Sequence, residues 1–168
     1  MRFIKLGVIS IVFFALLITG ISLLLPSTVY ISRAIDINAP VETAYNNVSN
    51  LANWKNWYVD YDSATAVLSA NTTRPGASLR MQKLSIKLVE VTPAQVKAIW
   101  QNGESMQLPG EFNFISQPGA TQMTLQWKFK HTVKWYPWQK FASILSDKAI
   151  GPSMEKSLQS LKDYVEKS

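Results

Sequence analysis

Residues 135–168 read WYPWQKFASILSDKAIGPSMEKSLQSLKDYVEKS, and this stretch decides the fold. Its apolar residues recur mainly in steps of three and four, which places them on one stripe of a helix. The stripe consists of Trp138, Phe141, Ile144, Leu145, Met154, Leu158, Leu161 and Val165. Pro137 suits a first helical turn, and Gly151-Pro152 predicts a break or kink with Pro152 restarting the helix. An amphipathic helix that follows strands needs a sheet to bury its stripe.

The chain between residues 61 and 131 is predicted to form that sheet from short strands separated by turn residues. In the clearest strand, residues 121–131, apolar residues and His131 alternate with polar ones, as in an antiparallel sheet with one solvated face. We expect the strands near residues 64–69, 78–83, 85–91, 95–101, 111–116 and 121–131. We expect turns at residues 74–76, 92–93, 102–103, 109–110 and 118–119.

A strand and two short helices are predicted before this series. Residues 29–37 alternate as a strand does, and Arg33 interrupts its apolar face, so we place Arg33 near a strand end or expect it to snorkel. Pro40 then starts a helix, and a second short helix covers residues 51–57. We expect Trp54 and Trp57, in this second helix, to fix the helices on the sheet edge rather than to line a ligand entrance.

The composition of the 168 residues excludes several kinds of site. The chain has no cysteine, so disulfides and thiolate chemistry are excluded, and its single histidine argues against a histidine-rich metal site or a histidine-based triad. The net charge of +6 is scattered rather than clustered, which argues against nucleic acid as a partner. Asp60 and Asp62 are too few to hold a cation, and a solvated loop is the favoured interpretation. The sequence therefore predicts no catalytic residue, no metal and no cofactor.

The N-terminal stretch is predicted to anchor the protein in a membrane. Residues 6–25 carry no charge, and twenty residues of helix match the hydrocarbon core. The stretch ends in LLLP without a good cleavage site, which favours an uncleaved anchor over a signal peptide. Arg2 and Lys5 precede it, so we expect a cytoplasmic N-terminus and an extracytoplasmic domain, periplasmic in a bacterium. Residues 1–26 are thus expected to form the tip and anchor, and residues 27–168 the domain.

Three segments give residues 29–167 a resemblance to the SRPBCC or START-like superfamily, and most closely to its polyketide cyclase/dehydrase-like branch. They are residues 33–42 (RAIDINAPVE), 53–57 (NWKNW) and 147–162 (DKAIGPSMEKSLQSLK). The resemblance implies an α+β helix-grip fold, in which a curved antiparallel sheet wraps a long C-terminal helix and leaves an apolar cavity. It also implies ligands such as lipids, sterols, quinones or polyketides, without choosing among them.

We therefore expect a membrane-tethered domain that binds an apolar small molecule, such as a lipid or quinone, between the sheet and the C-terminal helix. The expected ligand-binding residues are Met81, Leu88, Trp100, Phe112, Phe114, Met123, Leu125, Trp127, Phe141 and Leu145. A cyclase- or hydrolase-type enzyme using the same cavity is one alternative, and a protein-interaction module at the membrane surface is the other. Few titratable groups are expected to face inward, which disfavours the enzyme. We expect His131 to be a strand-end residue that meets water or a backbone partner, rather than an acid or base at the cavity mouth.

Overall fold

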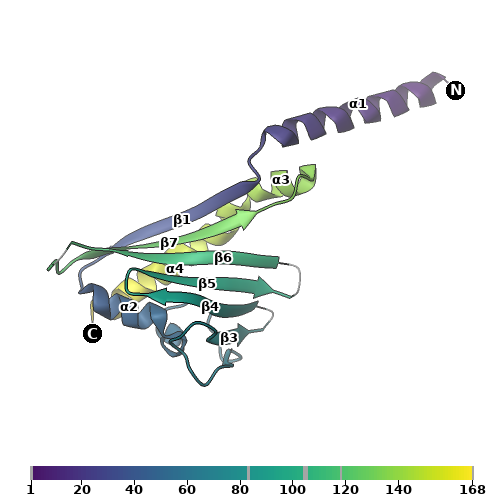
Figure 1. Ribbon diagram of the computed structural model, residues 1–168. Coiled ribbons are helices and arrows are strands. Elements are labelled where there is room, and N and C mark those ends of the chain that lie inside the picture. The colour runs from purple at the N-terminus through teal and green to yellow at the C-terminus, as the bar shows by residue number, and fades with distance from the viewer. Residues whose placement is uncertain (1, 83, 104–105, 118, 168) are drawn as a thin grey trace.

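The computed structural model describes residues 2–82, 84–103, 106–117 and 119–167. Helix α1 projects from the N-terminal end, and the remaining elements form a sheet with α4 along one face (Figure 1). The elements are α1 (Arg2–Leu24), β1 (Thr28–Ile37), α2 (Val41–Ser49), the 3-10 helix η1 (Leu51–Asn56), β2 (Ala66–Val67), β3 (Ser78–Met81), β4 (Leu84–Thr92), β5 (Gln95–Asn102), β6 (Met106–Ile115), β7 (Met123–Thr132), α3 (Pro137–Ile144) and α4 (Ser146–Val165).

A single antiparallel sheet of seven strands has the order β1-β7-β6-β5-β4-β3-β2. The first strand pairs with the last along ten residue pairs, from Thr28 opposite Thr132 to Ile37 opposite Met123. The sheet curves around α4, which also contacts β1. This is the predicted α+β helix-grip fold. The predicted alternation in β7 is confirmed, because Met123, Leu125, Trp127 and Phe129 are all buried.

The C-terminal stripe is buried only in its second half. Met154, Leu158, Leu161 and Val165 of α4 are at most 3% exposed, as predicted. The first half of the prediction is wrong, because Trp138, Phe141, Ile144 and Leu145 are 40–67% exposed. The helix breaks at Leu145, whose N–H donates to the carbonyl of Ala142 at 3.0 Å. This hydrogen bond spans three residues, where a regular α-helical bond spans four, so it tightens the turn between α3 and α4. The two helices therefore present different faces to the sheet.

The break predicted at Gly151-Pro152 does not occur, since both residues lie inside α4. Gly151 instead makes room for the guanidinium group of Arg33, with which any Cβ at this position would collide. Of the two alternatives given for Arg33, the strand end is wrong, because the residue lies opposite Trp127 in the middle of the β1–β7 ladder, whereas its charged head does reach the surface. Its side chain reaches across α4 to Asp147 and Glu155, four residues before and after the glycine.

Asp147 should make stability depend on acid pH. Arg33 donates two hydrogen bonds to it, at 2.9 and 3.1 Å, and thereby lowers the pKa of the Asp147 carboxyl. A carboxyl whose pKa is lower in the folded state stabilises the fold above its unfolded-state pKa of about 3.9, and loses this contribution as pH falls through the folded-state pKa. Asp147→Asn should therefore lower the thermal midpoint at pH 7, and the difference from wild type should shrink below about pH 4.

Circular dichroism melts of both proteins at pH 7 and at low pH measure this difference. In an Arg33→Met background, Asp147→Asn should have no such pH-dependent effect, because the partner is gone. A difference that stays constant with pH would show that the ion pair is not its source.

The turn predicted at Pro109-Gly110 is wrong, since both residues continue β6. Gly110 allows the strand to pass beneath two rings: a Cβ there would lie 2.6 Å from atoms of both Trp100 and Phe129. Pairing of β6 with β7 begins at Gly110 opposite Phe129, directly after the proline, which has no N–H to donate. Strand β2 is also shorter than the predicted strand 64–69.

Trp54 and Trp57 pack in the interior, as the structural role predicted for them requires. Trp54 and Trp57 are 0% and 2% exposed. The indole N–H of Trp54 donates to the carbonyl of Val48 at 2.9 Å, and that of Trp57 donates to the carbonyl of Asn47 at 3.2 Å. These bonds join η1 to α2, and the rings fix both helices to the sheet core.

Candidate ligand cavity

A cavity of about 230 Å³ lies between the inner face of the sheet and α4. Three parts of the chain line it, it opens to the surface, and most of its lining is apolar. The sheet contributes Leu84, Trp100, Asn102, Leu108, Trp127 and Phe129, helix α4 contributes Ala149, Ile150, Ser153 and Met154, and the segment after η1 contributes Tyr58 and Asp60.

Aromatic rings form the rigid wall of this cavity. Trp100 lies 5.7 Å from Trp127 and 4.7 Å from Phe129 between ring centroids, the latter pair edge to face. Trp127 in turn stacks on Phe112 at 4.8 Å in the core behind it. Such ring pairs hold one another in place beyond the effect of burial alone. The wall is therefore preorganised and presents apolar surface to whatever enters.

The polar groups at this wall are few. Trp100 donates its indole N–H to the Tyr58 hydroxyl at 3.1 Å. Burial raises the pKa of the Tyr58 hydroxyl, and the Asp60 carboxylate raises it further, so the hydroxyl is neutral at physiological pH. Asp60 itself accepts from the Ser153 hydroxyl at 2.8 Å. The indole N–H of Trp127 is buried and has no hydrogen-bond partner among the described residues.

The structure separates the ten predicted ligand-binding residues into three groups. Trp100 and Trp127 line the cavity. Six more are buried in the core without lining it, namely Met81, Leu88, Phe112, Phe114, Met123 and Leu125. Phe141 and Leu145 lie outside it, 40% and 60% exposed, because the helix break turns α3 away from the sheet.

Several lining residues were missed from the sequence. Ala149, Ile150 and Ser153 come from the part of α4 where a break was expected. Ile150 precedes Met154 by one helical turn, and this spacing was the signal that could have placed it on the inner face. Tyr58 and Asp60 lie in a loop, where no periodicity points to a cavity.

His131 stands apart from this cavity. Its Nδ1 lies 2.9 Å from the hydroxyl oxygen of Ser146, at the start of α4. It therefore has a side-chain partner, whereas water or a backbone group was expected. His131 borders a separate hollow of about 330 Å³ beside α3, together with Gln107 and Gln139. This position gives it no contact with a ligand in the cavity.

The two aspartates considered as cation ligands do not converge. Asp60 bonds to Ser153 on α4, whereas Asp62 accepts from Thr65 at 2.8 Å and from Gln82 at 2.9 Å. Hydrogen bonds from Thr65 and Gln82 lower the pKa of the Asp62 carboxyl. Within the described part of the chain, no group of three or more His, Asp or Glu residues could hold a metal ion.

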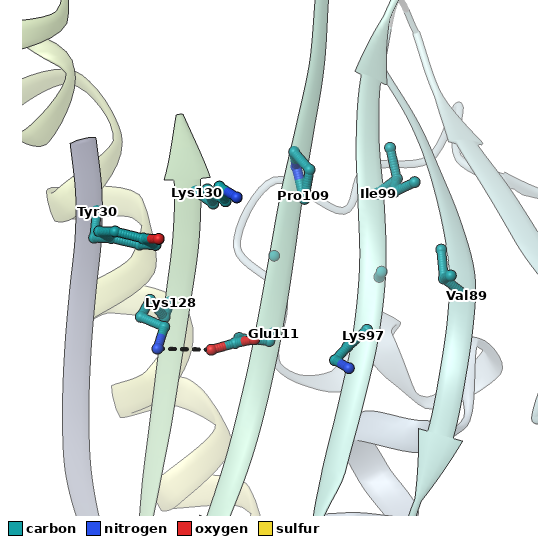
Figure 2. Close-up of a pocket in the computed structure, with 10 residues that line it drawn as sticks. Tyr30, Val89, Lys97, Ile99, Pro109, Glu111, Lys128 and Lys130 are labelled. Carbon is teal, nitrogen blue, oxygen red and sulfur yellow. Dashed lines mark ion pairs between the residues drawn. The ribbon is translucent and has the colours of Figure 1, made fainter. Parts of the chain in front are cut away.

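Another hollow, of about 360 Å³, lies on the outer face of the sheet (Figure 2). Figure 2 shows Tyr30, Pro109, Ile99 and Val89 along it, with lysines between them. Two of these lysines are paired within the sheet, Lys128 with Glu111 at 2.8 Å and Lys97 with Glu90 at 2.7 Å. Both hollows open to the surface, but the inner cavity has the more apolar lining and a rigid aromatic wall, so it is the better candidate for a site that binds an apolar small molecule.

Comparison with known proteins identifies the family. The family described as "Polyketide cyclase / dehydrase and lipid transport" matches residues 28–166, nearly all of the chain beyond α1. The chain belongs to this family. Its fold places it in the START-like, or SRPBCC, superfamily, as the sequence motifs predict. No curated protein matches the chain.

Solved structures of START-like proteins share the fold at low sequence identity. Norcoclaurine synthase from Thalictrum flavum, solved with dopamine and hydroxybenzaldehyde, is 12% identical with a TM-score of 0.66, covering 82% of this chain and 86% of its own. A START superfamily protein from Mycobacterium smegmatis is 17% identical with a TM-score of 0.62, covering 82% and 97%. A protein from Thermobifida fusca is 14% identical with a TM-score of 0.64, covering 81% and 92%.

Proposed function

We propose that this family member is a membrane-tethered domain that binds the apolar part of a small molecule, such as a lipid or quinone. The observation that supports the proposal is the cavity between the sheet and α4, which is walled by aromatic rings and largely apolar. Burial of an apolar ligand there contributes roughly 2.5 kcal/mol for every 100 Å² of apolar surface removed from water. The family's description, which includes lipid transport, agrees with this use.

The size of the cavity limits what it holds. Its volume of about 230 Å³ is below the roughly 300–1,000 Å³ of most ligand pockets. A ring or a short acyl segment fits within it, and a longer molecule has to extend beyond its mouth.

Photolabelling tests the location of binding. A fatty acid that carries a diazirine on its chain should label cavity residues of the full protein in detergent micelles, above all on the peptide containing Met154. Labelling of the domain confined to the outer face, around Tyr30 and Pro109, would contradict the proposal. His131→Ala should leave the cavity label unchanged.

Catalysis in the same cavity is the second candidate, and one observation favours it. Tyr58 and Asp60, a neutral hydroxyl and a carboxylate, both lie at the wall, where they could transfer a proton. Asp60→Asn separates the two functions. A turnover on a candidate substrate that disappears in this variant, while cavity labelling persists, would establish an enzyme. Unchanged labelling in the absence of any turnover is expected for a binding protein.

We further propose that α1 anchors the domain. Residues Phe3–Leu24 form a helix long and apolar enough to cross a membrane, and almost all of its side chains are exposed. Arg2 and Lys5 at its start favour a cytoplasmic N-terminus. Protease added to intact spheroplasts should therefore digest the domain. Digestion only after lysis would reverse this topology, and extraction of the protein from membranes by alkaline carbonate would refute the anchor itself.

A further inference from the structure

Helix α3 and the residues beside it expose an unusual amount of apolar surface. We define the α3 apolar surface as Trp135, Trp138, Phe141, Ile144 and Leu145, which are 59%, 67%, 40%, 57% and 60% exposed. Four of them recur at helical spacing from Trp138 onward, so they share one side of the helix. Single exposed apolar residues are ordinary in soluble proteins, but a contiguous patch marks a contact surface.

The opposite side of α3 is polar and buried. A helix that packs on a hydrophobic core instead buries its apolar side and exposes its polar side. Lys140 and Ser143 are only 4% and 2% exposed. The Lys140 ammonium group donates to the carbonyl of Leu25 and, at 2.8 Å, to the hydroxyl of Ser27. Ser143 donates to the carbonyl of Lys140 at 2.7 Å. These bonds fix the helix with its apolar side outward.

The partners of Lys140 also fix where α3 lies. Leu25 directly follows α1, so the bond ties α3 to the end of the proposed membrane span. Figure 1 shows α3 beside the junction of α1 and β1, at the end of the sheet from which α1 projects. The ring of Tyr136 stacks on Trp138 with centroids 4.9 Å apart. Trp and Tyr side chains are enriched in the layer of a membrane where the hydrocarbon core meets the lipid headgroups.

We propose that the α3 apolar surface lies in the interfacial layer of the bilayer, as a second membrane contact beside α1. This inference rests on the proposed anchoring by α1, which brings α3 to the membrane surface. A helix with one apolar side and a polar opposite side lies in the interface plane with its apolar residues among the lipids. Two contacts, unlike a single flexible tether, orient the domain on the bilayer.

The orientation has a consequence for the cavity. Ala149, which lines it, follows Leu145 by four residues, or about 6 Å of helix. The α4 wall of the cavity therefore begins roughly one helical turn from the lipid-facing residues. An apolar ligand that dissolves in the bilayer has only a short distance to travel between the lipid and the cavity.

Depth-dependent fluorescence quenching tests the contact on the full chain. The protein has no cysteine, so Ile144→Cys, Leu68→Cys and Ile11→Cys each give a single labelling site for the dye NBD. Leu68 is a matched control, 50% exposed but near β2, at the opposite edge of the sheet from β1. The labelled chains are reconstituted in phosphatidylcholine vesicles with and without doxyl-labelled lipid. We expect several-fold stronger quenching at position 144 than at position 68.

The site in α1 distinguishes the two proposals. One outcome is strong quenching at position 11 together with quenching at position 144 that is no stronger than at position 68. This outcome would overturn the interfacial contact and leave the anchor intact. Absence of quenching at position 11 would refute the anchor, and with it the inference. NBD emission at 144 that is shifted to the blue but is not quenched by doxyl lipid would overturn the inference in favour of a protein partner or a second copy of the chain.

Discussion

Replacing Trp54 with alanine should lower the free energy of unfolding by about 3–5 kcal/mol. The side chain is completely buried, and its ring lies within 6.0 Å, between centroids, of the rings of Trp100 and Phe112. Truncation leaves a large cavity and removes the hydrogen bond to the Val48 carbonyl, which joins η1 to α2. Urea unfolding of the full chain in detergent micelles, followed by far-UV circular dichroism, measures the change.

Trp138→Ala is the matched control for this experiment. It deletes the same atoms from a side chain that is 67% exposed, so it should change the free energy of unfolding by no more than about 0.5 kcal/mol. A loss below about 1 kcal/mol for Trp54→Ala would contradict the structural role of Trp54. It would instead make Trp54 a candidate for contact with a ligand or partner.

Filling the cavity should weaken ligand binding. Ala149 lies on the exposed edge of α4 and lines the cavity, so a tryptophan there can occupy the ligand's space without deleting any core contact. We expect Ala149→Trp to weaken binding of a dansyl-labelled acyl probe at least about tenfold, the equivalent of 1.4 kcal/mol. A fluorescence titration in micelles, corrected for probe that dissolves in the detergent, gives the dissociation constant.

Gln159→Trp adds the same indole to an exposed position of the same helix, away from the cavity. It should bind the probe as tightly as wild type. Equal weakening by both substitutions would point to a general effect on α4, and no weakening by Ala149→Trp would place the probe elsewhere. Thermal unfolding of both variants shows whether each keeps the fold.

Local patterns in the sequence were enough to predict the frame of this fold. The alternation of Met123, Leu125, Trp127 and Phe129 defines the inner face of β7, and the spacing of Met154, Leu158 and Leu161 defines the buried side of α4. Both depend only on the repeat of a strand or a helix. The apolar run of α1 is similarly local, because length and composition alone mark it as a candidate membrane span.

The errors concern residues whose role is set by distant parts of the chain. Gly151 and Pro109-Gly110 look like breaks in sequence, but Gly151 accommodates Arg33 from β1, and Gly110 passes beneath Trp100 and Phe129. Phe141 fits an amphipathic stripe, yet a single tightened turn at Leu145 points α3 away from the sheet. No local pattern contains these contacts.

The cavity itself was predictable as a feature of the fold but not in its lining. Trp100 and Trp127 were identified because they lie on inward faces of long strands. Whether an inward residue borders empty space or packs in the core, as Phe112 does, depends on how closely α4 approaches the sheet at that point. Tyr58 and Asp60 reach the cavity from a loop, whose path follows from tertiary packing.

Native mass spectrometry of the full chain, released from detergent micelles, tests the central claim most directly. Wild type purified from membranes should carry an apolar molecule of defined mass that organic solvent removes. The same adduct should be present on Gln159→Trp and missing from Ala149→Trp. A wild-type protein without any adduct, even after incubation with a membrane lipid extract, or an equal adduct on all three proteins, would contradict binding in the cavity.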